Sequence, residues 1–293
     1  MPTEAEIPNF NTLFRLDGKV ALVTGGASGI GYYICAAFMQ AGCAKVIIAS
    51  RKEAQLKEAC DKLNALGLPG KASYIVSNVS TFAGVEKLGE DLKKMLPDGK
   101  LHILVNNAAA SWGGPFEEFE DWKVAKTLDV NVRAVFNVTR VMQPFLVAAG
   151  TKDDPARNII VSSVGGIIVS HVGKTGAIIY GASKAAAHHL TRHFALEHIP
   201  HNITTNTIAP GWFPTRLANP AIEKAGGADV AGASNPTGRL GVPEDIAGVA
   251  VYLASRAGRY VNGEDISVDG GSRLMNPGAM QHIKEVREKY SKL

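Results

Sequence analysis

The sequence lacks several features that would place the chain outside a reducing compartment or in a membrane. It has only three cysteines, an odd number with no Cys-x-x-Cys pair, so neither a disulfide framework nor a cysteine metal site is expected. No run of apolar residues approaches the length that a membrane-spanning helix needs, and the acidic N-terminus lacks the basic and apolar regions of a secretory signal. We therefore expect free thiols and no membrane partner.

A large excess of one charge is also missing. Lys and Arg total 31 against 27 Asp and Glu, a formal net charge of +4, and the charges are scattered without long runs of like sign. Nucleic-acid binding usually needs a concentrated basic surface, so no nucleic-acid partner is expected. The 31 glycines and the 46% hydrophobic content of the 293 residues instead suit a globular domain with many tight turns.

Short β-branched runs alternate with longer amphipathic stretches along the chain. This alternation predicts the α/β class, with a single Rossmann-type, doubly wound parallel sheet of about seven strands and helices on both faces. The expected strands span residues 19–24, 45–49, 72–76, 101–105, 158–162, 203–208 and 266–268. The expected helices span residues 30–41, 52–66, 85–96, 121–149 with a bend near Pro144, 180–198 and 243–254.

The same pattern divides the chain into three segments. Residues 1–14 are expected to form a flexible N-terminal segment, residues 15–274 the Rossmann domain, and residues 275–293 a polar C-terminal tail. Residues 215–236, rich in Ala, Gly and Asn, are expected to form a small mobile lid over the substrate. Ligands of such sheets bind beyond the carboxyl ends of the strands, so residues that follow strands are the candidates for chemistry.

A glycine-rich turn follows the first expected strand and opens the first expected helix. Gly25, Gly29 and Gly31 are spaced G-x-x-x-G-x-G and let the backbone approach a pyrophosphate closely. Backbone amides at the helix start, including those of Ser28 and Ile30, are expected to donate to the anion. A plain structural turn is the alternative, but the strand before it and the helix after it favour a dinucleotide site.

Three further motifs follow in order: Asn-Asn-Ala-Ala at 106–109, Tyr-Gly-Ala-Ser-Lys at 180–184 and Pro-Gly at 210–211. Together with the glycine-rich turn they resemble the motifs of the short-chain dehydrogenase/reductase family, over about residues 16–271. The resemblance implies an enzyme that transfers a hydride between a nicotinamide cofactor and a carbonyl or alcohol group. It also implies a homodimer or homotetramer formed through the two long helices.

The end of the second expected strand indicates which nicotinamide cofactor binds. An NAD enzyme usually places Asp or Glu there for the ribose 2′-hydroxyl, whereas this chain has Ser50, Arg51 and Lys52. A guanidinium pairs with a 2′-phosphate through charge-assisted hydrogen bonds, so NADP(H) is the predicted cofactor. The alternative is that Arg51 and Lys52 are only solvated charges at the start of a helix.

The family resemblance implies the remaining cofactor contacts. Asn78 and Val79 fall beside the adenine, where relatives often have Asp-Val, and Asn107 and Ala108 fall on the adenine-ribose side. A last group follows the sixth expected strand, where relatives hold the nicotinamide carboxamide. Its members are Pro210, Gly211, Phe213 and Thr215.

Ketone reduction needs a proton donor beside the hydride, and Tyr180 is the candidate. Lys184 lies four residues later on the same helix face, and its ammonium, together with the positive nicotinamide of the oxidised cofactor, is expected to lower the tyrosine pKa. By resemblance, Tyr180 and Lys184 also contact the cofactor, with Lys184 on the nicotinamide ribose, and Asn131 holds a water in a proton relay. Ser163 resembles the donor to the substrate carbonyl, with Ser162 as the near alternative. The 17 positions from Ser163 to Tyr180 exceed the spacing in many relatives and predict an extended loop over the substrate.

Several histidines and an aromatic residue fit less specific patterns. His189 and His193 have the i, i+4 spacing of metal ligands but lack a third ligand. Together with His188 they are expected on a helix surface or in subunit packing, and no metal is expected. His171, in the extended loop, is a candidate substrate contact. Trp112 follows the fourth expected strand and indicates either an apolar substrate pocket or aromatic core packing.

Three short stretches resemble the β-ketoacyl reductases linked to rhamnolipid synthesis: Ser-Trp-Gly at 111–113, Asp-Pro-Ala-Arg at 154–157 and Ala-Pro-Gly-Trp-Phe-Pro at 209–214. This resemblance implies a small-molecule carbonyl substrate such as a 3-oxoacyl thioester. One alternative is a reductase of a secondary-metabolite ketone or of a sugar or polyol. Another is a non-catalytic NADP-binding sensor or scaffold, which would not need an intact Ser-Tyr-Lys set.

The chain stops at Ser291-Lys292-Leu293, which is a peroxisomal address when it lies at a free C-terminus. A chance match is the alternative. The tripeptide predicts a peroxisomal import receptor as a partner and the peroxisome as the location, with the cytoplasm otherwise.

Overall fold

The computed structural model describes residues 6–169 and 172–290. Its centre is a sheet of seven strands in the order β3-β2-β1-β4-β5-β6-β7, and every neighbouring pair is parallel. The predicted Rossmann-type fold is therefore confirmed. The strands are β1 Val20–Thr24, β2 Lys45–Ser50, β3 Lys71–Val76, β4 Ile103–Asn106, β5 Ala156–Val161, β6 Ile203–Pro210 and β7 Asp265–Val268.

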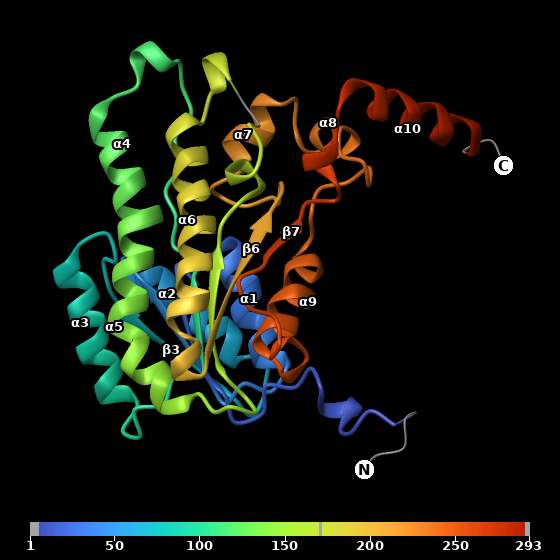
Figure 1. Ribbon diagram of the computed structural model, residues 1–293. Coiled ribbons are helices and arrows are strands. Elements are labelled where there is room, and N and C mark those ends of the chain that lie inside the picture. Colours follow the sequence, from blue (N-terminus) through green and yellow to red (C-terminus); the bar gives the residue numbers. More distant parts are fainter. Residues whose placement is uncertain (1–5, 170–171, 291–293) are drawn as a thin grey trace.

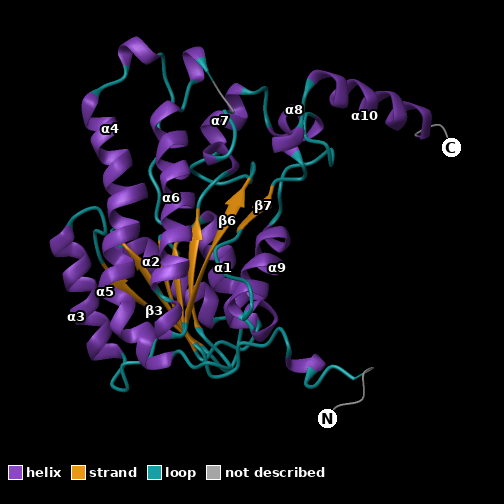
Figure 2. Ribbon diagram, in the orientation of Figure 1, coloured by secondary structure: helices purple, strands orange, loops and turns teal. Residues whose placement is uncertain are grey.

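Helices cover both faces of this sheet (Figures 1 and 2). One layer contains α1 Gly29–Gln40, α2 Glu53–Asn64 and α9 Pro243–Ala254, and the other contains α3 Phe82–Met95, α5 Ala134–Ala149 and α6 Ile178–Glu197. The remaining helices are α4 Asp121–Leu128, α7 Asn219–Lys224, α8 Ala228–Ala233 and α10 Pro277–Tyr290.

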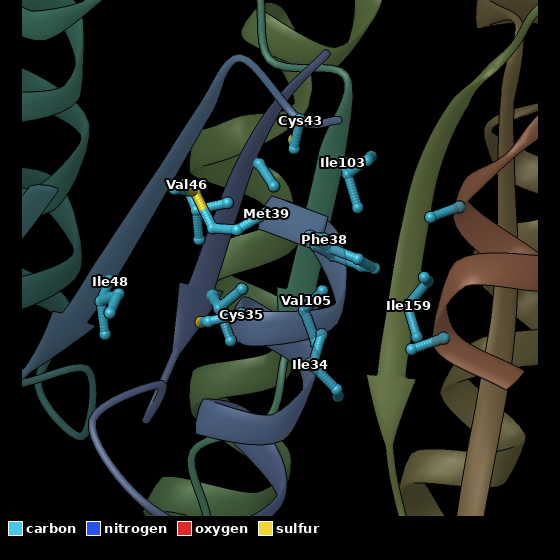
Figure 3. Close-up of a cluster of buried hydrophobic side chains, with 14 of the residues drawn as sticks. Ile34, Cys35, Phe38, Met39, Cys43, Val46, Ile48, Ile103, Val105 and Ile159 are labelled. Atoms are coloured by element: carbon cyan, nitrogen blue, oxygen red, sulfur yellow. The ribbon is translucent and has the colours of Figure 1, made fainter. Parts of the chain in front are cut away.

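The core consists of buried side chains that alternate between the two faces of the strands. In β1, Ala21 and Val23 join the cluster under α1, α2 and α9, whereas Leu22 joins the cluster under α3 and α5. Figure 3 shows part of the first cluster, where Ile34 and Phe38 of α1 pack against the sheet. Because a buried parallel sheet has apolar residues on both faces, its strands read as continuous hydrophobic runs, as the sequence indicated.

The expected single helix over residues 121–149 is wrong in one respect. The chain forms α4, then a π-helical segment, Asp129–Arg133, and then α5. Pro144 lies inside α5 and does not end it. The irregularity falls instead at Asn131, whose buried amide bonds to the loop after β4 and to α6. An extra residue in the turn accommodates these tertiary contacts, which local propensity does not reveal.

The predicted lid and tail contain helices. α7 and α8 lie within residues 215–236, separated by Gly226 and Gly227, which have φ of 100° and 94°. α10 extends away from the sheet (Figure 1). His171 and the Ser-Lys-Leu end lie outside the described residues. Among the helices of the described part of the chain, none is long and apolar enough to cross a membrane.

Candidate active site

One cavity of about 770 Å³ opens at the carboxyl ends of the strands. Residues that follow β1, β2, β3, β4, β5 and β6 line it. It contains the point between β1 and β4 where the strand order reverses, which is where α/β sheets bind their ligands. Its size is within the range of sites for small molecules and cofactors. All of the predicted site residues line it except Gly31 and Asn131.

The glycine-rich turn is built for close approach of a ligand to the backbone. Gly25 and Gly29 have φ of 68° and 55°, in the left-handed region that side chains other than glycine rarely adopt. Gly31 is buried behind the cavity wall, and a Cβ on it would lie 2.4 Å from Asn107 Nδ2. Ser28 is the N-cap of α1 and makes no side-chain cap bond, so the first amides of the helix remain free to receive an anion.

Thr24 and Asn107 hold this turn against β4. Thr24 Oγ1 accepts hydrogen bonds from the backbone amides of Asn107 at 3.0 Å and Ala108 at 3.1 Å. Asn107 Nδ2 donates to the carbonyl of Thr24 at 2.9 Å and to that of Gly25 at 3.2 Å. The side chain of Asn107 therefore supports the loop, and Ala108 faces the cavity from the same segment.

Two cations lie at the end of β2, on the rim of the cavity. Arg51 and Lys52 are exposed there beside Ser50. Within the described residues, neither has a hydrogen bond or ion pair to another side chain, whereas six other arginines are paired with a carboxylate. Their charge is thus available to an anionic group in the cavity. Together with the glycine-rich turn, these residues fit a dinucleotide that carries an extra phosphate.

A polar chain continues this rim along the residues that follow β3. Asn78 Oδ1 accepts from Ser80 Oγ at 2.8 Å, and that hydroxyl accepts from Lys126 Nζ at 2.7 Å. Val79 lies between them on the cavity wall. These hydrogen bonds fix the side-chain amide of Asn78 with its oxygen turned toward Ser80. Its Nδ2 is therefore the group able to donate to a bound base.

Tyr180 and Lys184 come from the first turns of α6 and face the cavity together. Lys184 is only 3% exposed, and its Nζ donates to the carbonyl of Val161 at 2.9 Å. This nitrogen lies 5.7 Å from the centroid of the Tyr180 ring. Burial disfavours the ammonium and lowers the pKa of Lys184 to about 8.

The expectation that Lys184 lowers the tyrosine pKa is not met in this structure. Burial raises the pKa of Tyr180 above its ordinary value, and a side-chain hydrogen bond with Ser163 opposes this effect. The ammonium lies over the ring and donates to a backbone carbonyl, so it gives the phenol oxygen no direct hydrogen bond. Tyr180 therefore stays protonated at neutral pH and can act as an acid.

The geometry favours Ser163 over Ser162 as the partner of Tyr180. Ser162 is 4% exposed, and its hydroxyl is committed to the carbonyl of Lys184 at 2.9 Å. Ser163 is partly buried and accepts a hydrogen bond from the amide of Gly165 at 3.1 Å, which leaves its proton free to donate. The hydroxyls of Ser163 and Tyr180 therefore converge on one part of the cavity.

Asn131 lies behind the cavity wall. Its Oδ1 accepts from the amide of Ala110 at 2.8 Å, and its Nδ2 donates to the carbonyl of Ala110 at 2.8 Å and to Ser183 Oγ at 2.9 Å. These bonds use both donors of the side chain, which clamps the loop after β4 to α6. Its part in a proton relay stays a prediction.

The other end of the cavity is aromatic. Trp112 and Trp122 meet edge to face, with ring centroids 5.4 Å apart and planes at 77°. Thr215 lies against the glycine-rich turn, since a Cβ on Gly29 would come within 3.2 Å of it, and Pro210 and Gly211 line the same cavity. The Phe213 ring is 2% exposed and packs under Gly241, so its side chain belongs to the core.

The structure corrects the expectation for His188. Rather than lying on a surface, it is 4% exposed and bonds to Asp265 and to the backbone of Ser163. His189 and His193 are exposed, as expected, and their rings are in contact. Within the described residues, no group of three metal-ligating side chains forms.

Comparison with known proteins decides the family. A family model described as enoyl-(acyl carrier protein) reductase matches residues 25–273, which include the glycine-rich turn, Ser163, Tyr180 and Lys184. The chain belongs to the short-chain dehydrogenase/reductase family. The resemblance inferred from the motifs is thereby confirmed, and the protein is an oxidoreductase of the class that acts on alcohol and carbonyl groups.

Two relatives and one solved structure illustrate the similarity. The rhamnolipids biosynthesis 3-oxoacyl-[acyl-carrier-protein] reductase of Pseudomonas aeruginosa is 38% identical over 262 residues, which are 89% of this chain and 98% of that protein. The 3-oxoacyl-[acyl-carrier-protein] reductase FabG of Thermotoga maritima is 37% identical over 261 residues, 88% of this chain and 98% of its own. The Pseudomonas aeruginosa RhlG/NADP active-site complex has a TM-score of 0.82 at 36% identity, covering 90% of this chain and 99% of that one.

Motif reasoning missed several residues of this dehydrogenase/reductase site. Lys126, Trp122 and Arg216 line the cavity but belong to no family motif. Trp122 and Lys126 lie four residues apart on α4, so one face of that helix borders the cavity. That spacing was visible in the sequence, but the direction in which α4 faces depends on the tertiary fold.

Proposed function

We propose that the protein is an NADPH-dependent reductase of ketones, with Tyr180 as the general acid and a 3-oxoacyl thioester as the substrate class. The observation that carries this proposal is the pair of hydroxyls, Ser163 and Tyr180, joined beside the buried Lys184 in the cavity that the glycine-rich turn opens. Such a set is needed for carbonyl chemistry and has no use in a passive sensor.

Each residue of the set has a distinct task. Bound NADPH supplies the hydride, so the chain must orient the carbonyl and deliver a proton. Ser163 donates a hydrogen bond to the carbonyl oxygen and holds it within reach of Tyr180. The Tyr180 hydroxyl transfers its proton to this oxygen as negative charge develops there. Lys184 binds the ribose beside the reacting centre and places a positive charge near the resulting phenolate.

The protonation of Tyr180 favours reduction at neutral pH. Burial raises the pKa of this phenol, so the acid form that reduction needs is present. Alcohol oxidation needs the phenolate and should become favourable only as the pH rises. The two directions should thus have opposite pH profiles, with reduction faster on the acidic side.

The cofactor preference rests on the free charge at the end of β2. Arg51 borders the cavity with no partner among the described side chains, and no carboxylate occupies the position that a ribose 2′-hydroxyl would need. Arg51 therefore binds the 2′-phosphate of NADPH, with Ser50 and Lys52 beside it.

Arg51→Asp is expected to reverse this preference. The change removes the charge-assisted bonds to the phosphate and adds repulsion, so the Kd for NADPH should rise by about 10²-fold, or about 3 kcal/mol. The Kd for NADH should stay equal or fall. Titration of nicotinamide fluorescence measures both constants. Lys57→Asp on the outer side of α2 is the control, since it makes the same charge change away from the cavity. An unchanged NADPH preference in Arg51→Asp contradicts the assignment.

The substrate class is supported by the aromatic end of the cavity. Trp112 and Trp122, with Leu217 of the predicted lid, give a wall suited to an acyl chain, and the two relatives reduce 3-oxoacyl groups by name. The test is NADPH oxidation with acetoacetyl-CoA, a longer 3-oxoacyl-CoA, crotonyl-CoA and a panel of sugar ketones. Higher kcat/KM for the 3-oxoacyl thioesters supports the proposal. Preference for crotonyl-CoA or for a sugar ketone rejects this substrate class.

Assembly into a homodimer or homotetramer is part of the proposal. α5 and α6 lie side by side on one face of the domain and expose Phe136, Val147 and Leu196. Exposed apolar side chains on two long helices are typical of an interface between subunits. Sedimentation at micromolar protein concentration tests this, and a monomer there contradicts it.

We also propose import into the peroxisome through the Ser291-Lys292-Leu293 end. In support, α10, the last described helix, ends at Tyr290 and extends away from the sheet (Figure 1), and Ser-Lys-Leu is a peroxisomal address where it forms a free C-terminus. A fluorescent protein fused to the N-terminus should give punctate peroxisomal fluorescence, and deletion of residues 291–293 should make it diffuse. The same fluorescent protein at the C-terminus is a matched control, because it masks the address. Equal distributions of the full and truncated chains contradict the proposal.

A further inference from the structure

α6 carries two further polar side chains, His188 and Arg192, in line with the tyrosine and lysine of the motif. Tyr180, Lys184, His188 and Arg192 follow one another at intervals of four residues, so they form one row along the helix. The first two lie in the cavity, and the row then continues away from it toward β7. Since His188 and Arg192 have no task in the reaction described above, their contacts need another explanation.

His188 is buried between two oxygen atoms. Its Nδ1 lies 2.7 Å from Oδ1 of Asp265, on β7, and its Nε2 lies 3.1 Å from the backbone carbonyl of Ser163. The imidazole is 4% exposed, so water does not replace either contact. The second oxygen of Asp265 pairs with Arg192. The histidine therefore connects the edge strand of the sheet to the residue that donates to the substrate carbonyl.

Both neighbours of the ring are acceptors only. A carboxylate and a backbone carbonyl have no proton to give, so each ring nitrogen must carry one to make a favourable contact. A neutral imidazole would turn a lone pair toward one of the two oxygens. Two charged groups lie near the ring: Asp265 from β7 and Arg192 from the next turn of α6. The Asp265 carboxylate contacts the imidazole directly, and Arg192 pairs with that carboxylate. Hydrogen bonds from the ring to both oxygens would therefore need a proton on each ring nitrogen.

The contact to Ser163 completes a set of bonds between α6 and the end of β5. Lys184 Nζ donates to the carbonyl of Val161, and Ser162 Oγ donates to that of Lys184, both at 2.9 Å. His188 then binds the carbonyl of Ser163, which also accepts from the amide of Gly166 at 3.0 Å. Three consecutive residues are each tied to the helix that carries Tyr180. The two donors to Ser163 use both lone pairs of its carbonyl and fix that peptide.

The loop that follows Ser163 is shaped around the histidine. A Cβ on Gly166 would lie 2.9 Å from Cδ2 of His188 and 2.6 Å from the backbone of Lys184. A side chain at position 166 would therefore separate the loop from α6. Because position 166 is glycine, the turn packs directly against the imidazole. The ring therefore contacts this loop twice, through Nε2 at the Ser163 carbonyl and through Cδ2 at Gly166.

We propose that His188, held in its charged form by Asp265, is a positioning residue that aims the Ser163 hydroxyl at the substrate carbonyl. It touches neither substrate nor cofactor and acts through the Ser163 peptide. The inference rests on the proposed reductase function for its kinetic consequence, whereas the charge state of the ring can be measured without any activity.

A double-mutant cycle tests the kinetic part. His188→Gln should lower kcat for ketone reduction about tenfold, as expected for loss of one aiming hydrogen bond, with little change in the Kd for NADPH. In the Ser163→Ala background the same change should cost less than about twofold, because the residue through which it acts is gone. Equal losses in both backgrounds overturn the proposal, as does unchanged kcat in His188→Gln.

A matched variant and a spectroscopic signal separate positioning from general damage. His198→Gln removes another buried imidazole, at the C-terminal end of α6, which stacks on Phe194 and does not touch Ser163, and kcat should be unaffected by it. In the cofactor-free protein with ¹⁵N-labelled histidine, both ring nitrogens of His188 should give protonated shifts at pH 7, and Asp265→Asn should abolish this. A neutral His188 ring overturns the proposal even if the reductase activity is as proposed. If instead the ring is charged but no ketone is reduced, the proposed function has failed and not the charge assignment.

Discussion

Tyr180→Phe is expected to lower kcat for ketone reduction by about 10²–10⁴-fold, the range typical for loss of a general acid. The substitution removes one oxygen and leaves the ring, so the packing of α6 and the position of Lys184 should persist. The developing alkoxide then keeps the hydrogen bond from Ser163, but this hydroxyl is a much weaker acid than a phenol, so the proton must come from water. Because the hydroxyl contributes little to cofactor binding in the proposed mechanism, the Kd for NADPH should stay within about twofold.

Steady-state NADPH oxidation with acetoacetyl-CoA measures this effect, and fluorescence titration measures the binding. Tyr252→Phe is the matched control, since this residue lies on α9 away from the cavity and loses the same atom. A single-turnover measurement should show the same loss, which places it in the chemical step and not in product release. If Tyr180→Phe turned over ketones as fast as the wild type, the mechanism would have to be abandoned.

The parts of the site that sequence could predict are those determined by neighbours in the chain. The glycine-rich turn was readable because its strand, turn and helix follow one another within residues 20–40. Tyr180 and Lys184 were readable because helical periodicity alone places them together. Each such assignment depends on local geometry, which a spacing of three or four residues encodes directly.

The parts that sequence could not predict depend on contacts between distant segments. His188 belonged by pattern to a surface cluster, but Asp265, 77 residues away, draws it into the interior. The direction of the Tyr180 pKa shift in the protein without cofactor was hidden for a similar reason: spacing shows that an ammonium is near, but not that the lysine donates to Val161 and that burial dominates. The π-helical segment around Asn131 was hidden too, since its cause is the loop after β4.

Lys184→Met is expected to separate activity from stability. Activity should fall by about 10²–10³-fold, as for the loss of one preorganised charge beside the reacting oxygen. The folded protein, however, holds this ammonium in a place that disfavours it: burial lowers its pKa from 10.5 to about 8, which corresponds to about 3 kcal/mol at about 1.36 kcal/mol per unit. Methionine fills similar space without the charge. At pH 7 the variant should therefore be at least as stable as the wild type, although Val161 loses its hydrogen-bond donor.

The stability difference between Lys184→Met and the wild type should also depend on pH, and this dependence gives the sharper test. Between about pH 8 and 10.5 the unfolded wild type holds the lysine proton that the folded state has released, so wild-type stability rises in this window relative to the variant. Absolute stabilities are less informative there, since burial raises the pKa of Cys43 to about 12 and of Cys60 to about 11, and these thiols make the folded state less stable as the pH rises. Both proteins share the thiols, so subtracting one stability from the other removes their effect.

Denaturant unfolding at pH 7 and pH 10 should show any stability advantage of Lys184→Met shrinking by up to about 3 kcal/mol. Lys57→Met, which removes an exposed ammonium on α2, is the control. A constant difference between wild type and Lys184→Met across this range would mean that Lys184 is not held as a strained buried charge, and its role beside Tyr180 would then need another physical basis.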